Sequence, residues 1–171
     1  MTRPRRFDLI VFDWDGTLFD STELIASCIQ ASCADLDQPV PSLRDASYVI
    51  GLGLSEALAH AAPGLSPDRY PELSARYRHH YFARQNELSL FDGSLSMLHA
   101  LRQRNHSLGV ATGKSRRGLD DVLRMVQLKG LFDATRTADE TRSKPHPQML
   151  NELMAELGVE TGRTRMIGDT T

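Results

Sequence analysis

The sequence is poor in cysteine and has no long hydrophobic run. Cys28 and Cys33 are its only cysteines, and at this spacing on a helix they cannot both face one partner well. We therefore expect buried free thiols, which fit a reducing compartment, rather than a disulfide or a metal site. The first apolar run, residues 9–12, is far too short for a signal-peptide core or a membrane span. We expect a cytoplasmic protein without a membrane partner.

Charge of neither sign is in excess, since 20 Lys and Arg residues face 22 Asp and Glu residues and leave a net charge of −2. Such a balance does not indicate nucleic acid or an anionic membrane as the main partner. Hydrophobic residues make up 40% and charged residues 25%, which is typical of a globular protein and does not indicate disorder. Repeats and low-complexity segments are also lacking. The 171 residues suit one domain, or a core with a small insertion.

Short apolar runs mark the expected strands. Uninterrupted runs of this length are typical of strands buried on both faces of a parallel sheet. Helical patterns alternate with them in the second half of the chain, which predicts an α/β fold with a doubly wound, Rossmann-like parallel sheet. The expected strands are residues 9–12, 108–111, 132–137 and 165–167.

The region from 19 to 88 breaks this alternation, because it offers helical patterns and no convincing strand. A helical stretch between the first strand and the rest predicts an insertion. We therefore expect a core domain of residues 1–18 and 89–171 and a helical cap domain of residues 19–88. A basic cluster around His79 and His80 is interpreted as a solvated helix face, with a surface that attracts a phosphorylated substrate as the alternative.

Polar side chains follow the expected strands at their carboxyl ends, the edge at which parallel sheets hold their ligands. We expect these groups to converge there, so that carboxylates, a hydroxyl and an ammonium share one site. They are Asp13 and Asp15 after the first strand, Thr112, Gly113 and Lys114 after the second, Lys144 beyond the third, and Gly168 and Asp169 after the fourth.

Such a set of groups suits phosphoryl transfer with magnesium. Mg²⁺ prefers hard oxygen ligands and takes only a few from protein, which Asp13 and Asp169 can supply. Asp13 can then attack phosphorus and form an aspartyl-phosphate, while Asp15 protonates the leaving oxygen and later activates water. The hydroxyl of Thr112 and the ammonium of Lys144 can hold the equatorial oxygens as charge shifts.

Four short motifs in this order resemble those of the haloacid dehalogenase superfamily. Residues 11–18, which read VFDWDGTL, resemble the first motif and carry the strongest signal. Residues 111–113, 143–145 and 167–170 resemble the second, the third and the start of the fourth. Within the superfamily the chain resembles the phosphoglycolate phosphatase-like group, in which a helical cap is inserted just after the first motif.

This resemblance implies a phosphatase that acts on a small phosphorylated metabolite, which the sequence does not name. Asp13 would be the nucleophile and Asp15 the acid/base. Thr112, Gly113 and Lys144 would bind the substrate phosphate; Mg²⁺ would be held by Asp13, the backbone carbonyl of Asp15, and Asp169. Superfamily members that cleave haloacids or phosphonates lack an acid at the position of Asp15. The phosphonate-cleaving members use a cap lysine, and residues 19–88 contain no lysine.

Three alternatives stay open. A phosphosugar mutase of the same superfamily shares the acid at position 15. A signalling receiver domain also combines an aspartate, a hydroxyl and a lysine at strand ends, although the sequence Asp13-x-Asp15-Gly-Thr and the helical insertion speak against it. The third alternative is a non-catalytic binding protein on the same fold. The sequence indicates no oligomeric state.

The resemblance also implies that the core continues beyond the sequence. In the family the fourth motif runs on to a second acid four residues after the position of Asp169, and this sequence ends at Thr171. Family members then add further helices and strands. We therefore expect the C-terminal part of the core to be missing, one face of the sheet to lack its cover, and Mg²⁺ binding to be weaker as a result.

Overall fold

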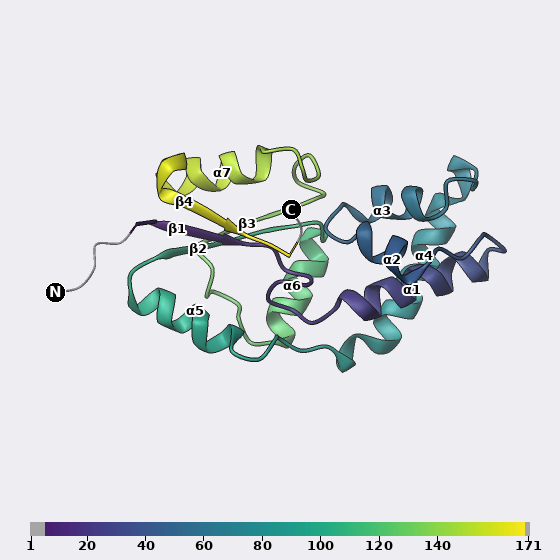
Figure 1. The fold of residues 1–171 in the computed structure, drawn as a ribbon, viewed down its shortest axis with the longest axis horizontal. Coiled ribbons are helices and arrows are strands. Elements are labelled where there is room, and N and C mark those ends of the chain that lie inside the picture. The colour runs from purple at the N-terminus through teal and green to yellow at the C-terminus, as the bar shows by residue number, and fades with distance from the viewer. Residues whose placement is uncertain (1–5, 170–171) are drawn as a thin grey trace.

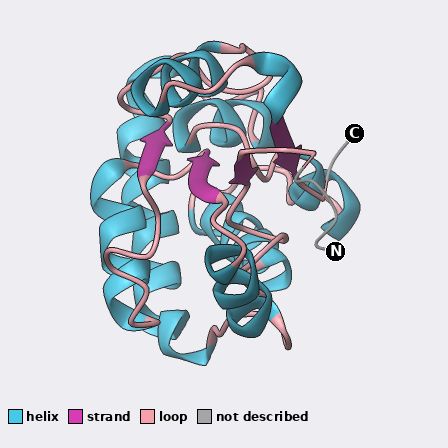
Figure 2. Cartoon of the chain, turned by 90° about the vertical axis from the view of Figure 1, so that its left-hand side faces the viewer, coloured by secondary structure: helices cyan, strands magenta, loops and turns pink. Residues whose placement is uncertain are grey.

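The computed structural model describes residues 6–169, which form a parallel four-stranded sheet with helices on both faces (Figure 1). The strand order is β3-β2-β1-β4. Figure 2 shows the strands side by side in a row between the helices. The predicted doubly wound parallel sheet is thus confirmed. Its strands are β1 (Leu9–Phe12), β2 (Ser107–Thr112), β3 (Ala134–Thr137) and β4 (Thr164–Ile167).

Strand β1 lies inside the sheet and is buried on both of its faces. Leu9 and Val11 pack toward α7 (Gln148–Leu157), whereas Ile10 and Phe12 pack in the cluster that includes α5 (Ser94–Gln103) and α6 (Arg116–Met125). Four consecutive apolar residues are therefore needed, because alternate side chains point to opposite faces and both faces are covered. The strand ends where the sequence turns polar, at Asp13.

Local sequence signals set the ends of the core helices. The hydroxyl of Ser115 accepts a hydrogen bond from the backbone N–H of Gly118 (3.1 Å) and caps α6. Pro147 precedes the first residue of α7, and Gly158 ends this helix with a φ of 64°, which glycine adopts without a Cβ clash. A short 3₁₀ helix, Thr161–Arg163, then leads into β4.

The residues between β1 and α5 form a separate group of helices at the carboxyl end of the sheet (Figure 1). This group has an apolar cluster of its own, in which Cys28 and Cys33 are buried free thiols, as predicted. The division into core and cap domains stays a prediction that this cluster favours. The elements are α1 (Thr22–Asp35), α2 (Leu43–Tyr48), α3 (Leu54–Ala61), α4 (Tyr70–Arg84) and the 3₁₀ helices Pro67–Arg69 and Gln85–Glu87.

Helix α2 was not expected from the sequence. Its six residues are too few for a helical period to show. The signal that could have found it is a cap, because the Ser42 hydroxyl accepts from the Asp45 backbone N–H at 3.1 Å and donates to its carboxylate at 2.6 Å. Among residues 6–169, no helix has both the length and the apolar character needed to cross a membrane.

The helix layer on the α5 side can be tested with two leucines on one helix. Leu98 is fully buried, whereas Leu95 is 45% exposed. We expect Leu98→Ala to lower the free energy of unfolding by about 2–5 kcal/mol, because it leaves a cavity under the sheet. The matched control Leu95→Ala should cost about 0.5 kcal/mol or less. Urea unfolding measures both, and equal losses would contradict the packing.

Candidate active site

Asp13 lies at the carboxyl end of β1, only 5% exposed. Its backbone N–H donates to the carbonyl of Ile167, which extends the pairing of β1 with β4 by one residue. Its Oδ1 accepts from the Trp14 backbone N–H at 2.7 Å, and its Oδ2 lies 2.6 Å from Nζ of Lys144. Nζ of Lys144 also reaches the carbonyl of Ala111 on β2, so this ammonium bridges two strand ends.

Two opposed effects set the charge of Asp13. Burial raises the pKa of its carboxyl, and the Lys144 ammonium lowers it again through charge attraction and a hydrogen bond. Burial is the larger of the two, so the pKa stays above its ordinary value. Lys144 and, to a smaller extent, the Trp14 backbone N–H therefore oppose neutralisation of this buried carboxylate.

Asp15, also buried, is held through one oxygen. Its Oδ1 accepts from the Ser21 hydroxyl at 2.7 Å and lies 3.2 Å from Nζ of Lys114. Ser21 thus precedes α1 without capping it, because its hydroxyl turns to Asp15 instead. Both donors act on Oδ1, which leaves Oδ2 as the oxygen available to a substrate.

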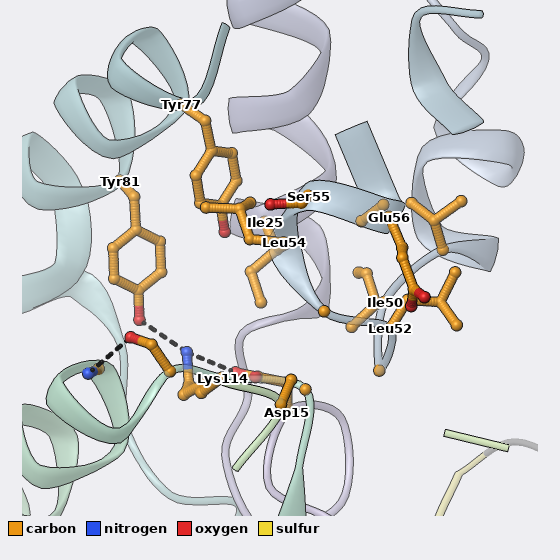
Figure 3. Close-up of a pocket in the computed structure, with 18 of the residues that line it drawn as sticks. Asp15, Ile25, Ile50, Leu52, Leu54, Ser55, Glu56, Tyr77, Tyr81 and Lys114 are labelled. Carbon is orange, nitrogen blue, oxygen red and sulfur yellow. Dashed lines mark hydrogen bonds and ion pairs between the residues drawn. The ribbon is translucent and has the colours of Figure 1, made fainter. Parts of the chain in front are cut away.

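Lys114 joins the core to the helical region (Figure 3). Besides Asp15, its Nζ lies 3.4 Å from the Tyr81 hydroxyl and 5.0 Å from the centre of the Tyr81 ring. Burial lowers the pKa of Lys114, but Asp15 and Tyr81 together outweigh it, so the pKa is raised and the group is charged. The sequence placed Lys114 at the site's edge without a role, and only its position beside Gly113 hinted at one.

Thr112 and Gly113 lie at the carboxyl end of β2, directly before Lys114. Thr112 is fully buried, and its hydroxyl accepts from the backbone N–H of Lys114 at 3.2 Å. A Cβ on Gly113 would collide with the backbone carbonyls of Gly51 and Leu52. The loop before α3 therefore rests directly on the core, and only glycine at position 113 permits this approach.

The same loop covers Asp13. A Cβ on Gly51 would lie 3.8 Å from both the Asp13 carboxylate and the Lys144 ammonium. Gly51 has a φ of 104°, a conformation that other residues adopt only with strain. The structure thus brings the sequence Gly51-Leu52-Gly53 to the site.

Asp169 lies against the loop that follows β1. A Cβ on Gly16, whose φ is 76°, would collide with the Asp169 carboxylate, and a Cβ on Gly168 would lie 3.8 Å from Cβ of Asp13. Within residues 6–169, no three His, Cys, Asp or Glu side chains form a metal cluster. The expected set contains only two carboxylates, those of Asp13 and Asp169, plus the Asp15 carbonyl. Such hard oxygens, completed by water, fit Mg²⁺.

Other residues singled out in the sequence fall outside this group. His80 pairs with Asp35 at 2.8 Å on the surface of the helical region, away from the strand ends. Trp14 is fully buried and packs against Phe19 and Phe132. Arg78, in contrast, lines the cavity described next.

A cavity of about 390 Å³ lies between the helical region and the core. Asp15 and Lys114 form its base, and side chains of α1, α3 and α4 form its walls (Figure 3). This cavity opens beside Asp15 and not beside Asp13. It is therefore placed to hold the part of a substrate that Asp15 would protonate.

The segment that leads to Lys144 is anchored by Arg116. The guanidinium binds both carboxylate oxygens of Glu140 at 2.8 Å and the Thr135 hydroxyl at 2.7 Å. The backbone N–H of Arg116 donates to Asp139 at 2.9 Å. The ion pair of Arg116 with Glu140 holds the start of the loop between β3 and α7, and this loop carries Lys144 to the site.

This anchor predicts a pH-dependent stability. Hydrogen bonds from Arg116 lower the pKa of Glu140 from 4.5 to about 2. The ionised Glu140 therefore stabilises the fold fully above pH 4.5, and this stabilisation is lost as the pH falls toward about 2. Glu140→Gln should therefore unfold more easily than the wild type at pH 7, by an amount that shrinks below pH 4.5. Urea unfolding between pH 7 and pH 3 measures this, with Glu160→Gln as the control. A loss that stays constant with pH would contradict the anchor.

Comparisons with known proteins identify the family of this chain. The family model described as haloacid dehalogenase-like hydrolase matches residues 10–171, so the chain belongs to this family. It is 30% identical over 171 residues to a phosphoglycolate phosphatase of Aliivibrio fischeri, a match that covers 95% of this chain and 75% of the relative. It is 29% identical to a pyrophosphatase PpaX of Halalkalibacterium halodurans, covering 95% and 74%.

Solved structures show the same fold. A predicted phosphoglycolate phosphatase from Haemophilus somnus superposes with a TM-score of 0.84 at 25% identity, covering 98% of this chain and 79% of that one. A haloacid dehalogenase-like hydrolase from Bacteroides fragilis gives 0.86 at 22% identity, covering 96% and 79%. This chain thus spans about three quarters of its relatives' length. Membership in a hydrolase family favours an enzyme over the receiver-domain alternative.

Proposed function

We propose that this protein is a magnesium-dependent phosphatase that hydrolyses a small phosphomonoester through an aspartyl-phosphate on Asp13. One observation carries the proposal: two aspartates two residues apart are each held by a different lysine. Lys144 pairs with Asp13, and Lys114 with Asp15. The names of the relatives, phosphoglycolate phosphatase and pyrophosphatase, support phosphate release as the outcome.

In the first step a carboxylate oxygen of Asp13 attacks phosphorus, and the bond from phosphorus to the ester oxygen breaks. The leaving oxygen takes a proton from Asp15. The ammonium of Lys144, 2.6 Å from the nucleophile, stabilises the equatorial oxygens as negative charge moves to them. The Thr112 hydroxyl and the Gly113 backbone N–H can bind the same oxygens.

In the second step Asp15, now a carboxylate, takes a proton from water, and the hydroxide attacks the phosphorus bound to Asp13. The aspartyl bond breaks, Asp13 regains its charge, and inorganic phosphate leaves. Because Ser21 and Lys114 both hold Oδ1 of Asp15, the free Oδ2 is the oxygen that carries the proton in both steps.

The metal site of this proposal consists of the Asp13 and Asp169 carboxylates and the Asp15 backbone carbonyl. Mg²⁺ bound there would offset the negative charge that otherwise keeps a phosphate away from a carboxylate. The position of Asp169 against the loop after β1 supports its part in this set.

Two further features belong to the same proposal. Residues 19–88 act as a cap that excludes water from the site, supported by the contact of Gly51 and Leu52 with Gly113. A cytoplasmic location is supported by the two free thiols in the helical region.

Asp13→Asn tests the nucleophile. We expect phosphate release in the presence of Mg²⁺ to fall by about a thousandfold or more, because an amide cannot form the covalent intermediate. Circular dichroism should show an unchanged fold, and the exposed neighbour provides the control Asp20→Asn, which should keep full activity.

A screen of phosphorylated metabolites with Mg²⁺ and with chelator provides the assay. Wild-type turnover in Asp13→Asn, or turnover unaffected by the chelator, would contradict the mechanism. Transfer of phosphate within a phosphosugar without its release would indicate the mutase instead.

A further inference from the structure

The cavity beside Asp15 is walled mainly by apolar side chains. Ile50, Leu52 and Leu54 come from the loop before α3 and its first turn, and the ring of Tyr77 comes from α4 (Figure 3). The ring of Phe82, also on α4, lines the cavity as well. Most of these residues also contribute to the apolar cluster of the helical region. Phe82 is the exception, since it is 50% exposed although it is a large aromatic residue. Its ring lines the cavity, so a ligand bound there would cover it.

The volume of the cavity exceeds what a two-carbon leaving group needs. About 390 Å³ falls within the range of pockets that enclose drug-sized ligands. A glycolate or phosphate leaving group would contact Asp15 and Lys114 at the base and leave the apolar walls untouched.

The charges that line the cavity do not favour an anionic leaving group. Its lining contains four carboxylates, those of Asp15, Glu56, Asp121 and Asp139, but only two cationic side chains, those of Lys114 and Arg78. Lys114 pairs with Asp15, and Arg124, which lies outside the lining, pairs with Asp121 at 3.1 Å. Glu56 and Asp139 then remain against the exposed Arg78. The lining therefore offers a second anion on the substrate no excess of positive charge.

We propose that this cavity binds an uncharged, largely apolar leaving group, so that the substrate is the phosphomonoester of an apolar alcohol and not a phosphate ester with a second anionic group. This inference rests on the proposed function, which supplies Asp15 as the boundary between phosphate and leaving group. The inferred substrate thus differs from phosphoglycolate and pyrophosphate, which the names of the relatives indicate.

Two alkyl phosphates of equal chemical reactivity test it through turnover. The leaving alcohols of hexyl phosphate and ethyl phosphate have nearly the same acidity, so a difference in kcat/KM reports the cavity. With Mg²⁺ we expect hexyl phosphate to be preferred at least about tenfold, because the extra methylenes leave water. Phosphoglycolate and pyrophosphate should be poorer substrates than hexyl phosphate. Equal rates for the two alkyl esters, or a preference for the anionic substrates, would overturn the inference.

A variant of the exposed ring locates the effect. Phe82→Ser should lower kcat/KM for hexyl phosphate by about three- to tenfold, and by less for ethyl phosphate, whose shorter chain buries less apolar surface. Tyr48→Ser is the matched control, because Tyr48 is an aromatic residue of the same helical region, is 86% exposed and does not line the cavity. An equal loss in both variants, or on both esters, would contradict the assignment.

Binding without turnover separates this inference from the proposed function. Alkylphosphonates have no ester oxygen to cleave, so calorimetry with the wild-type protein and Mg²⁺ measures the cavity alone. Hexylphosphonate should bind at least about tenfold tighter than ethylphosphonate, and butylphosphonate tighter than 3-phosphonopropanoate. If these preferences hold while no ester is hydrolysed, the phosphatase proposal fails and the cavity assignment stands. Affinity independent of chain length, or tighter binding of the carboxylate, would overturn the assignment.

Discussion

The site depends on a buried carboxylate whose charged form is favoured by a lysine from a distant part of the chain. Asp13 is buried because it follows a strand that is covered on both faces. This burial raises the pKa of its carboxyl. An isolated charge in that place would be costly, so the pair with Lys144 at 2.6 Å is required. The parallel sheet places Asp13 at the edge where Lys144, in a loop, also reaches the carbonyl of Ala111 on β2.

The helical region adds a second constraint, that of close backbone approach. Gly113 lets the carbonyls of Gly51 and Leu52 rest on the end of β2, and Lys114 then extends from this point to Tyr81 of α4. Core and helical region thus meet beside Asp13 and Asp15, the two residues to which the proposed mechanism assigns the chemistry. The same contacts leave a cavity beside Asp15 that side chains of the helical region and of the core line together.

Much of the fold and of the candidate site could be predicted from the sequence, because short buried strands that end in polar residues have a clear pattern. The positions of Asp13 and Lys144 at one sheet edge followed from this pattern. The role of Lys114 did not, because a single lysine in a loop has no periodic signal and its partners Asp15 and Tyr81 meet it only in the folded chain. Helix α2 was missed because six residues show no period.

The most direct test of the account is to trap the covalent intermediate. In Asp15→Ala an activated ester such as p-nitrophenyl phosphate can still transfer its phosphoryl group, because its leaving group needs no proton, but no base remains to activate water. Rapid acid quenching and mass spectrometry of the peptide that contains Asp13 would follow the product. The account predicts a phosphoryl group on Asp13 that accumulates in this variant. Nitrophenol release without such an adduct, or an adduct on another residue, would contradict it.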